Sequence, residues 1–125
     1  MKTITIVDGI IIKDKKILLL KKYHKDYYEF PGGKAKKGES LSDCLKRELK
    51  EEIGILPTKY HVLEELQPEF ENKNITDHGF VIEEYEWEPE IIEKYIFEEM
   101  TWKTLEEIEK IKIAPNLKQL LRQFS

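Results

Sequence analysis

Residues 33–55 read GKAKKGESLSDCLKRELKEEIGI, and this stretch contains the helix from which the rest of the fold can be worked out. Ser40 and Asp43 form a capping-box pattern at the start of that helix. Gly54 stands just after the last turn, where glycine commonly ends a helix, and Pro57 follows it. The pattern predicts a helix over residues 41–53.

Three glutamates of this helix stand where a helix built only for packing would carry other residues. With about 100° between successive residues, the apolar side chains form one stripe, which includes Glu48 and Glu52 and has Glu51 at its edge. The apolar members of the stripe are Leu41, Cys44, Leu45, Leu49 and Ile53. An unpaired buried carboxylate is costly, and like charges one turn apart repel. A divalent cation would offset both effects, and oxygen-only ligands favour Mg²⁺, or Mn²⁺ in its place, over zinc.

A solvated glutamate-rich face is the alternative interpretation, because helices rich in Lys and Glu commonly carry Glu at positions i and i+4. The residues before the helix favour the metal site. Pro31-Gly32-Gly33 lets the backbone approach a ligand closely, and the helix start that follows adds N–H donors and a positive dipole suited to phosphate. The two features together predict a site for a metal ion and a phosphorylated ligand.

Strand and helix signals flank this central helix on both sides. A β-hairpin is expected where two apolar runs enclose the polar turn at residues 13–16, and Pro31 with the glycines after it should end a short strand before the helix. The expected extended segments are residues 3–12, 17–20, 27–30, 60–66 and 75–87. Two later helices are expected near Thr104 and after Pro115. This order predicts an α/β fold in which a mixed β-sheet is sandwiched between α-helices.

The composition predicts one small globular domain, spanning residues 1–125. Asp and Glu number 25 against 21 Lys and Arg, and the net charge of −4 counts against binding to polymeric nucleic acid. Cys44 is the single cysteine, which excludes an internal disulfide and suits a reducing compartment. No apolar run approaches the length of a membrane span, and the N-terminus lacks a signal-peptide pattern. We therefore expect a cytoplasmic protein that does not enter membranes.

Residues 33–55 resemble the signature of a known family at all nine of its specified positions. That signature, the Nudix box, is G-x5-E-x7-R-E-U-x-E-E-x-G-U, where U is aliphatic. The matching residues are Gly33, Glu39, Arg47, Glu48, Leu49, Glu51, Glu52, Gly54 and Ile55. The segment at residues 29–34 resembles the start of the box in the MutT-type branch, and Trp102 and Ala114-Pro115-Asn116 resemble later parts of that branch more loosely.

The resemblance implies a Nudix fold and an enzyme that uses Mg²⁺ to hydrolyse a nucleoside diphosphate linked to another group. The metal ligands that it implies are Glu48, Glu51, Glu52 and the carbonyl of Gly32, and the catalytic residues are Glu48, Glu51, Arg47 and Glu39. Arg47 lies off the apolar stripe, as suits a guanidinium that orients a carboxylate. Glu48 is the first choice for the general base. A glutamate of a later loop is the alternative, with Glu93, Glu98 and Glu99 as candidates, although their spacing from Trp102 differs from the family pattern.

MutT-type enzymes cleave nucleoside triphosphates to the monophosphate and pyrophosphate, and some prefer oxidised nucleotides such as 8-oxo-dGTP. Asn116 corresponds to the position that reads the purine edge, although an Asn after Pro is also an ordinary capping residue. The candidate contacts to the nucleotide are Lys21, His24, Phe30, Gly32, Gly33, Lys73 and Asn116. Simpler interpretations exist for three of them: Phe30 as a core residue, His24 as an exposed loop residue and Lys73 as a turn residue.

Other substrates and one other class of function stay open at this point. Pro68 lies near, but not at, the spacing typical of ADP-ribose hydrolases, and no Tyr lies at the offset expected for diadenosine polyphosphate hydrolases. A non-catalytic Nudix module that only binds a nucleotide would usually have lost glutamates of the box, and here all are present. The resemblance is compatible with a monomer or a homodimer.

Overall fold

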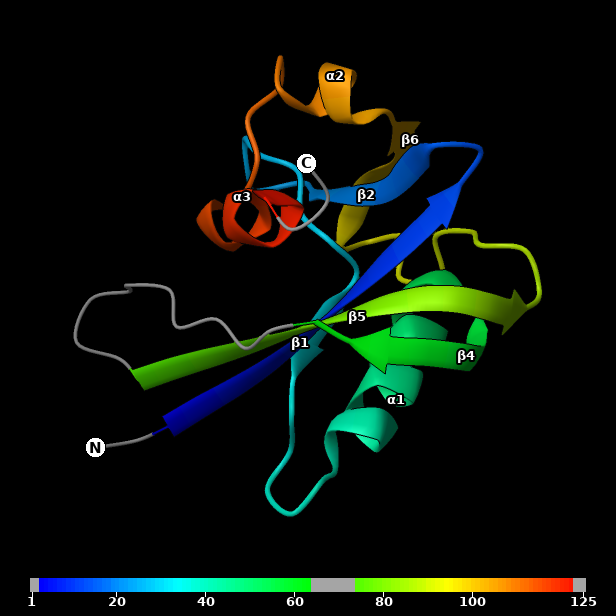
Figure 1. Ribbon diagram of the computed structural model, residues 1–125, viewed down its shortest axis with the longest axis vertical. Coiled ribbons are helices and arrows are strands. Elements are labelled where there is room, and N and C mark those ends of the chain that lie inside the picture. Colours follow the sequence, from blue (N-terminus) through cyan, green and yellow to red (C-terminus); the bar gives the residue numbers. More distant parts are fainter. Residues whose placement is uncertain (1–2, 64–73, 123–125) are drawn as a thin grey trace.

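The computed structural model describes residues 3–63 and 74–122, which form a mixed sheet with helices on both faces (Figure 1). The strands are β1 (Thr3–Lys13), β2 (Lys16–Lys22), β3 (Gly32–Lys34), β4 (Leu56–Val62), β5 (Asn74–Glu86) and β6 (Phe97–Lys103). The helices are α1 (Leu41–Ile53), α2 (Leu105–Ile108) and α3 (Pro115–Leu121). The strand order is β4-β5-β1-β2-β6, with β3 also paired to β1. Strands β1 and β5 run parallel and the other pairs antiparallel, so the predicted α/β class is confirmed.

Side chains that alternate along β1 and β2 enter two separate cores, because successive residues of a strand point to opposite faces of the sheet. The core beneath α1 includes Val7, Ile11, Leu18, Leu45 and Leu49. The core beneath α2 and α3 includes Ile10, Leu19, Phe30, Ile108 and Leu117. Both faces of the central strands are therefore covered, which explains their nearly continuous apolar sequence.

Helix α1 begins and ends where the sequence predicted. The Ser40 side chain accepts a hydrogen bond from the Asp43 N–H at 3.1 Å, which is the Ser40 half of the expected capping box. Gly54 adopts a left-handed conformation (φ 68°), and its N–H donates to carbonyls of the last turn. Glu52 is buried among the apolar residues of the stripe, as the helical wheel predicted. The helix thus carries a carboxylate into the space between itself and the sheet.

Strand β3 corrects one prediction. The sequence placed a short strand at residues 27–30 and a stop at the glycines, but it is Gly32–Lys34 that pairs with β1, whereas Tyr28 and Glu29 form isolated bridges. A Cβ on Gly32 would lie 2.0 Å from the carbonyl oxygen of Val7. The missing side chain therefore permits the pairing that it was expected to prevent, because it lets the two backbones approach closely.

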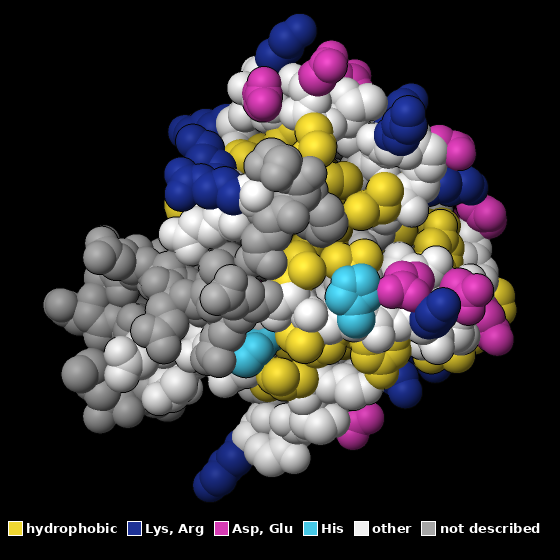
Figure 2. All heavy atoms as spheres, viewed as in Figure 1, with side chains coloured by type: hydrophobic (Ala, Val, Ile, Leu, Met, Phe, Trp, Pro, Cys, Tyr) yellow, Lys and Arg dark blue, Asp and Glu magenta, His cyan; other side chains and the backbone are white. Residues whose placement is uncertain are grey.

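The predicted hairpin of β1 and β2 forms, with Asp14 and Lys15 at positive φ in its two-residue turn. Strand β6 was not predicted. It pairs with β2 at the edge of the sheet, and Glu98 and Glu99 interrupt the apolar alternation by which a strand is recognised. Acidic and basic side chains are interspersed on the face shown in Figure 2. Among the described helices, none is long and apolar enough to cross a membrane.

Candidate active site

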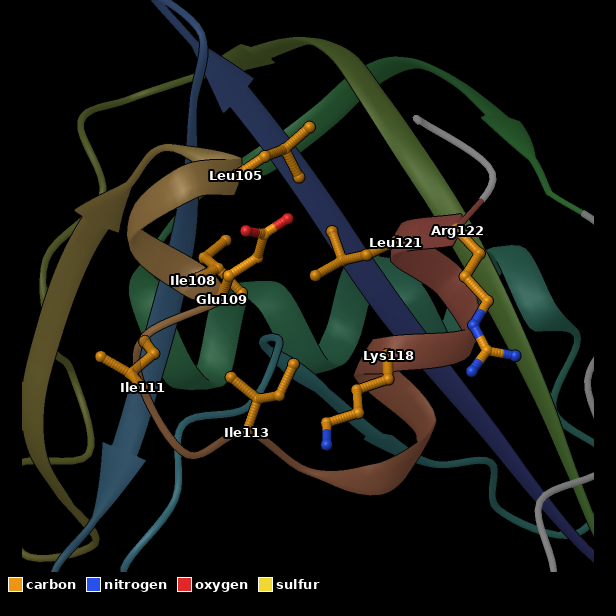
Figure 3. Close-up of a pocket in the computed structure, with 8 residues that line it drawn as sticks. All are labelled: Leu105, Ile108, Glu109, Ile111, Ile113, Lys118, Leu121 and Arg122. Atoms are coloured by element: carbon orange, nitrogen blue, oxygen red, sulfur yellow. The ribbon is translucent and has the colours of Figure 1, made fainter.

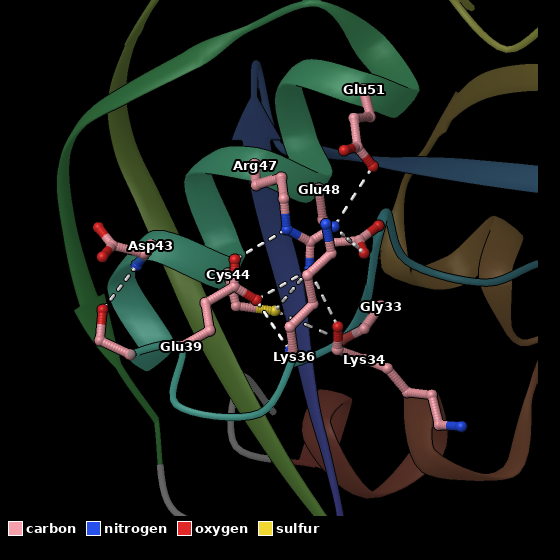
Figure 4. A network of polar contacts seen from close by, with 10 residues as sticks. Gly33, Lys34, Lys36, Glu39, Asp43, Cys44, Arg47, Glu48 and Glu51 are labelled. Carbon is pink, nitrogen blue, oxygen red and sulfur yellow. Dashed lines mark hydrogen bonds and ion pairs between the residues drawn. The ribbon is translucent and has the colours of Figure 1, made fainter.

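Arg47 connects the carboxylates at the outer side of α1 (Figure 4). Its Nε and Nη2 donate to the two carboxylate oxygens of Glu39 at 2.8 and 2.9 Å, a bidentate pair. Its Nη1 donates to Glu48 at 2.8 Å and to Glu51 at 3.4 Å, and Nη2 also reaches the carbonyl of Lys34 at 3.1 Å. The Arg47 hydrogen bonds lower the pKa of Glu39 to about 2. Arg47 therefore fixes the loop before the helix to the glutamates on it.

Glu52 faces the glycine loop from the inner side of the helix. Its Oε1 accepts a hydrogen bond from the backbone N–H of Gly32 at 2.9 Å, and its residue is only 7% exposed. Burial raises the pKa of Glu52 to about 9, and although the Gly32 N–H opposes this, the negative charges of Glu48, Glu29 and Glu93 add to it. A bound cation would have the opposite effect, because a positive charge beside the carboxylate lowers its pKa.

Gly33 has no side chain, and the carboxylate of Glu48 occupies the space where a Cβ would lie. A Cβ on Gly33 would lie 2.6 Å from the carboxyl carbon of Glu48 and 2.7 and 2.8 Å from its two oxygens. The carboxylate of Glu48 therefore lies directly against the backbone of strand β3. The two successive glycines thus bring backbone against two glutamates of α1, Gly32 against Glu52 and Gly33 against Glu48.

Glu93 joins these carboxylates from the segment between β5 and β6. The N–H of Glu90 donates to the carbonyl of Ile53 at 3.1 Å, and that of Ile92 donates to the carbonyl of Glu52 at 2.9 Å. These bonds attach the segment to the C-terminal end of α1. Burial, and then the charges of Glu51 and Glu48, raise the pKa of Glu93.

The other two late glutamates have partners of their own. Glu98 accepts from Lys21 Nζ at 2.7 Å, and Glu99 accepts from the Tyr28 hydroxyl at 2.9 Å. Of the three candidates for a later general base, the structure brings Glu93 to the glutamates of the box. Sequence spacing alone could not select it, because its position depends on the bonds that attach its segment to α1.

The donor set fits a hard divalent cation. It consists of carboxylates, which are among the oxygen ligands that Mg²⁺ and Mn²⁺ prefer. Among the described residues, no three His, Cys, Asp or Glu side chains are gathered into a ready metal cluster. Arg47 donates hydrogen bonds to Glu48 and Glu51, and the Gly32 N–H donates one to Glu52. A cation would therefore draw these carboxylates away from their present partners.

A cleft of about 370 Å³ opens beside the two glycines, on the sheet face opposite α1. Its lining includes Phe30, Gly32, Gly33, Lys22, Asp8 and Asp77. Lys22 pairs with Glu29 at 3.2 Å. Sequence reasoning did not select Lys22, Asp8 or Asp77 as site residues. Asp8 had a visible signal, because it interrupts an otherwise apolar strand, whereas nothing local distinguished the other two.

The remaining predicted contacts are distributed unevenly around this cleft. Phe30, Gly32 and Gly33 line it, and Phe30 is also part of a core, so the two interpretations of Phe30 are compatible. Lys21 is engaged with Glu98, and His24 is exposed in the loop after β2. Lys73 lies outside the described residues. Asn116 is the second residue of α3, but its side chain lies outside the description; its neighbour Pro115 lines the cleft.

A second cavity, of about 400 Å³, lies between α2 and α3 (Figure 3). Its lining is mainly aliphatic and includes Leu105, Ile108, Ile111, Ile113 and Leu121, with Lys118 and Arg122 on the α3 side. It shares no described residue with the cleft beside the glycines. Gly32 and Gly33, against which Glu52 and Glu48 lie, line the first cleft and not this cavity, so the chemistry of the α1 glutamates belongs to the first cleft.

Known proteins share both the sequence and the fold of this chain. A family model described as the NUDIX domain matches residues 3–124. The chain belongs to the Nudix family. The 8-oxo-dGTP diphosphatase of Buchnera aphidicola subsp. Acyrthosiphon pisum is 35% identical over 96 residues, which is 76% of this chain and 75% of that protein. The CTP pyrophosphohydrolase of Escherichia coli is 30% identical over 128 residues, or 99% and 93% of the two chains.

A solved structure also resembles this Nudix chain in fold and sequence. The solution structure of the E. coli ORF135 protein superposes with a TM-score of 0.86 at 32% identity, covering 99% of this chain and 89% of that one. The chain is a MutT-type Nudix hydrolase, acting on phosphoric anhydride bonds. Nudix hydrolases use a divalent metal and small nucleotide substrates, which agrees with the donor set on α1 and with a small cleft beside it.

Proposed function

We propose that this protein hydrolyses a nucleoside triphosphate to the nucleoside monophosphate and pyrophosphate, with Mg²⁺ held by Glu48, Glu51, Glu52 and the carbonyl of Gly32. Oxidised guanine nucleotides such as 8-oxo-dGTP are the substrates suggested by the Buchnera relative. One observation carries the proposal: the carboxylates of α1 lie against the Gly32-Gly33 backbone, which also lines the cleft. Metal ligands and a space for the nucleotide therefore meet at the same two residues.

Different residues would hold the metal, position the carboxylates and bind the nucleotide. Bound Mg²⁺ would polarise the phosphates and lower the pKa of a coordinated water. Arg47, held by both oxygens of Glu39, keeps Glu48 and Glu51 in position. Lys22 and Lys34 at the cleft supply positive charge for phosphate oxygens. The nucleoside would extend from the glycines past Phe30, where an aromatic face supports a base.

Two residues are candidates for the general base. Glu48 is the first, because it lies against Gly33 and would face the attacking water. Glu93 is the second, since burial and the nearby carboxylates raise its pKa, which makes its carboxylate a stronger proton acceptor than an ordinary glutamate. Glu93 lies outside α1 but near enough for the charges of Glu51 and Glu48 to act on it, so either Glu48 or Glu93 is a candidate to accept a proton from the same water.

A panel of nucleoside triphosphates with Mg²⁺ tests the proposal, with pyrophosphate and orthophosphate measured separately. We expect pyrophosphate, no orthophosphate, and a higher kcat/KM for 8-oxo-dGTP than for dGTP. Equal kcat/KM values for those two would reject the sanitising role and leave the hydrolase intact. Turnover confined to CTP, ADP-ribose or a diadenosine polyphosphate would select that other substrate, and binding without turnover would indicate a non-catalytic module.

The location and assembly of the protein are also proposals. We propose a cytoplasmic protein that forms one domain and is a monomer or a homodimer, without polymeric nucleic acid as a partner. Light scattering coupled to gel filtration gives the oligomeric state. A shift of labelled duplex DNA or RNA at physiological salt would contradict the last part, because the net charge of −4 predicts no such binding.

A further inference from the structure

Two acidic residues of the cleft lie outside the Nudix box and have no part in the proposed metal site. Asp8 is 5% exposed and Asp77 is fully buried, and both line the cleft beside Gly32. Asp8 lies on β1 and Asp77 on the parallel strand β5, where its register partner is Ile6. In this register both aspartates belong to the face of the sheet that bears Ile10, opposite the face packed on α1.

The fold does not need acids at these two positions. The surrounding face of the sheet is apolar, with Ile10, Leu19 and Phe30 in its core. Apolar residues of similar volume would hold two neighbouring strands at least as well as a buried carboxyl pair. The two side chains are close enough for a hydrogen bond, and burial followed by this bond raises the pKa of Asp8. A buried acidic pair that also opens into a cleft is therefore better explained by a ligand than by packing.

The cleft contains both basic and acidic groups, and their different chemistry indicates which part of a nucleotide meets the acidic pair. Lys22 and Lys34 provide positive charge, which suits phosphates. Asp8 and Asp77 provide carboxyl oxygens, which accept hydrogen bonds and repel phosphate. Phe30 adds an aromatic surface to the same lining. The volume of about 370 Å³ is that of a small-ligand site. The acidic pair therefore faces the part of a nucleotide that carries N–H donors, which is its base.

The common bases differ in how many neighbouring donors they present. Guanine carries a ring N1–H beside its exocyclic amino group, so two adjacent donors face one way. Adenine and cytosine present an amino group beside an acceptor nitrogen, and uracil and thymine present one N–H between two carbonyl oxygens. Two carboxyl oxygens side by side match the guanine edge and oppose the acceptors of the other bases.

We infer that Asp8 and Asp77 select the base of the substrate by accepting hydrogen bonds from the N1–H and exocyclic amino group of a guanine-type base. This inference rests on the proposed function, since it places the nucleoside end of the substrate in the cleft. It adds two specificity-determining residues that the Nudix box does not contain. Oxidation at C8 leaves that donor edge unchanged, so the pair would recognise dGTP and 8-oxo-dGTP alike.

Deoxyinosine nucleotides provide a sharp probe, because they lack the exocyclic amino group and keep the rest of the guanine outline. For the wild-type protein we expect a kcat/KM for dGTP at least about tenfold above that for dITP, the discrimination that a bidentate base contact provides. Asp77→Asn should lower this ratio toward one, because it replaces one acceptor oxygen of the pair by an amide NH2 donor. Asp14→Asn in the β1–β2 turn is the matched control, since Asn tolerates the positive φ there, and it should keep the wild-type ratio.

Calorimetric binding of dGMP and dIMP separates this inference from the proposed function. Preference for dGMP without hydrolysis of any triphosphate would reject the proposed function and support the acidic pair. Hydrolysis with equal kcat/KM for dGTP and dITP, or an unchanged ratio in folded Asp77→Asn, would overturn the pair and leave the function standing. If Asp77→Asn does not fold, the test uses Asp8→Asn and the ratio of the wild-type affinities for dGMP and dIMP. A wild-type affinity ratio near one rejects the inference.

Discussion

The backbone N–H of Gly32 donates a hydrogen bond to the side chain of Glu52 across 2.9 Å, although the two residues are 20 positions apart. This contact joins the glycine loop to the buried side of α1. It also places a carboxylate in a region where burial raises its pKa to about 9. The loop and the helix are thus one unit.

Replacing Glu52 by Gln should lower kcat/KM with Mg²⁺ by roughly a hundredfold or more, since even supporting residues of metal sites are worth ten- to a hundredfold. The change removes a proposed metal ligand and keeps its volume. Pyrophosphate release gives the rate, and Mg²⁺ titration gives the affinity. Glu106→Gln, on an exposed part of α2, is the control. Unchanged turnover in Glu52→Gln would contradict the metal assignment.

The stability of the metal-free protein should fall as the pH rises from about 5 to about 9. The pKa of Glu52 is higher in the folded than in the unfolded state, so the folded state holds the extra proton over this range and loses stability as that proton leaves. Urea unfolding in EDTA measures it. We expect Glu52→Gln to flatten the dependence by more than about 1 kcal/mol, since one pKa unit corresponds to about 1.4 kcal/mol. An equally steep pH dependence in the variant would rule out Glu52 as its source.

Gly33→Ala and Gly38→Ala should have opposite effects. A Cβ on Gly33 meets the mobile end of Glu48, so the carboxylate moves and activity falls by about tenfold or more, with little loss of stability. Gly38 has open space but a φ of 78°, so alanine there should cost about 1 kcal/mol of stability and leave the activity of folded protein near the wild-type value. Thermal unfolding and kcat/KM are measured on both. Loss of activity in Gly38→Ala alone would refute the assignment of Gly33.

Arg47→Lys should lower both stability and activity, because an ammonium cannot hold both oxygens of Glu39 while also reaching Glu48. The expected loss is about 1 to 3 kcal/mol in unfolding free energy, as for hydrogen bonds to charged groups, and roughly tenfold in kcat/KM. Arg122→Lys changes the other arginine, which is exposed, and serves as the control. Equal behaviour of the two variants would show that Arg47 carries no special positioning role.

Glu93→Gln should reduce kcat and change the acid side of its pH profile. Burial and the charges of Glu51 and Glu48 raise the pKa of Glu93, so a rate that depends on its deprotonated form should fall at a higher pH than for an ordinary glutamate. Glu98→Gln is matched and changes a residue paired with Lys21 instead. If kcat falls in Glu98→Gln and not in Glu93→Gln, the assignment of the later glutamate must be exchanged.

Much of the fold and of the site could be predicted from local sequence. The bounds of α1 follow from Ser40 and Gly54, because caps act on neighbouring residues. The wheel placed Glu52 in a buried stripe from its spacing alone. The spacing of the Nudix box gave the family, which the whole-chain match confirms. The nearly continuous apolar runs of the central strands agree with a sheet that is covered on both faces.

Other features arise only when distant segments meet. The pairing of Gly32 with β1 depends on a close backbone approach, and the position of Glu93 depends on bonds to the end of α1. Asp8 and Asp77 form a pair because a parallel strand pairing joins residues 69 positions apart, which no local spacing encodes. The sequence by itself determined the carboxylate helix and its family, because those depend on residues within a few turns of one another. The tertiary structure alone decided that Glu93 lies near the α1 glutamates and Asp8 beside Asp77, because sheet register and loop docking bring together groups that are far apart in the chain.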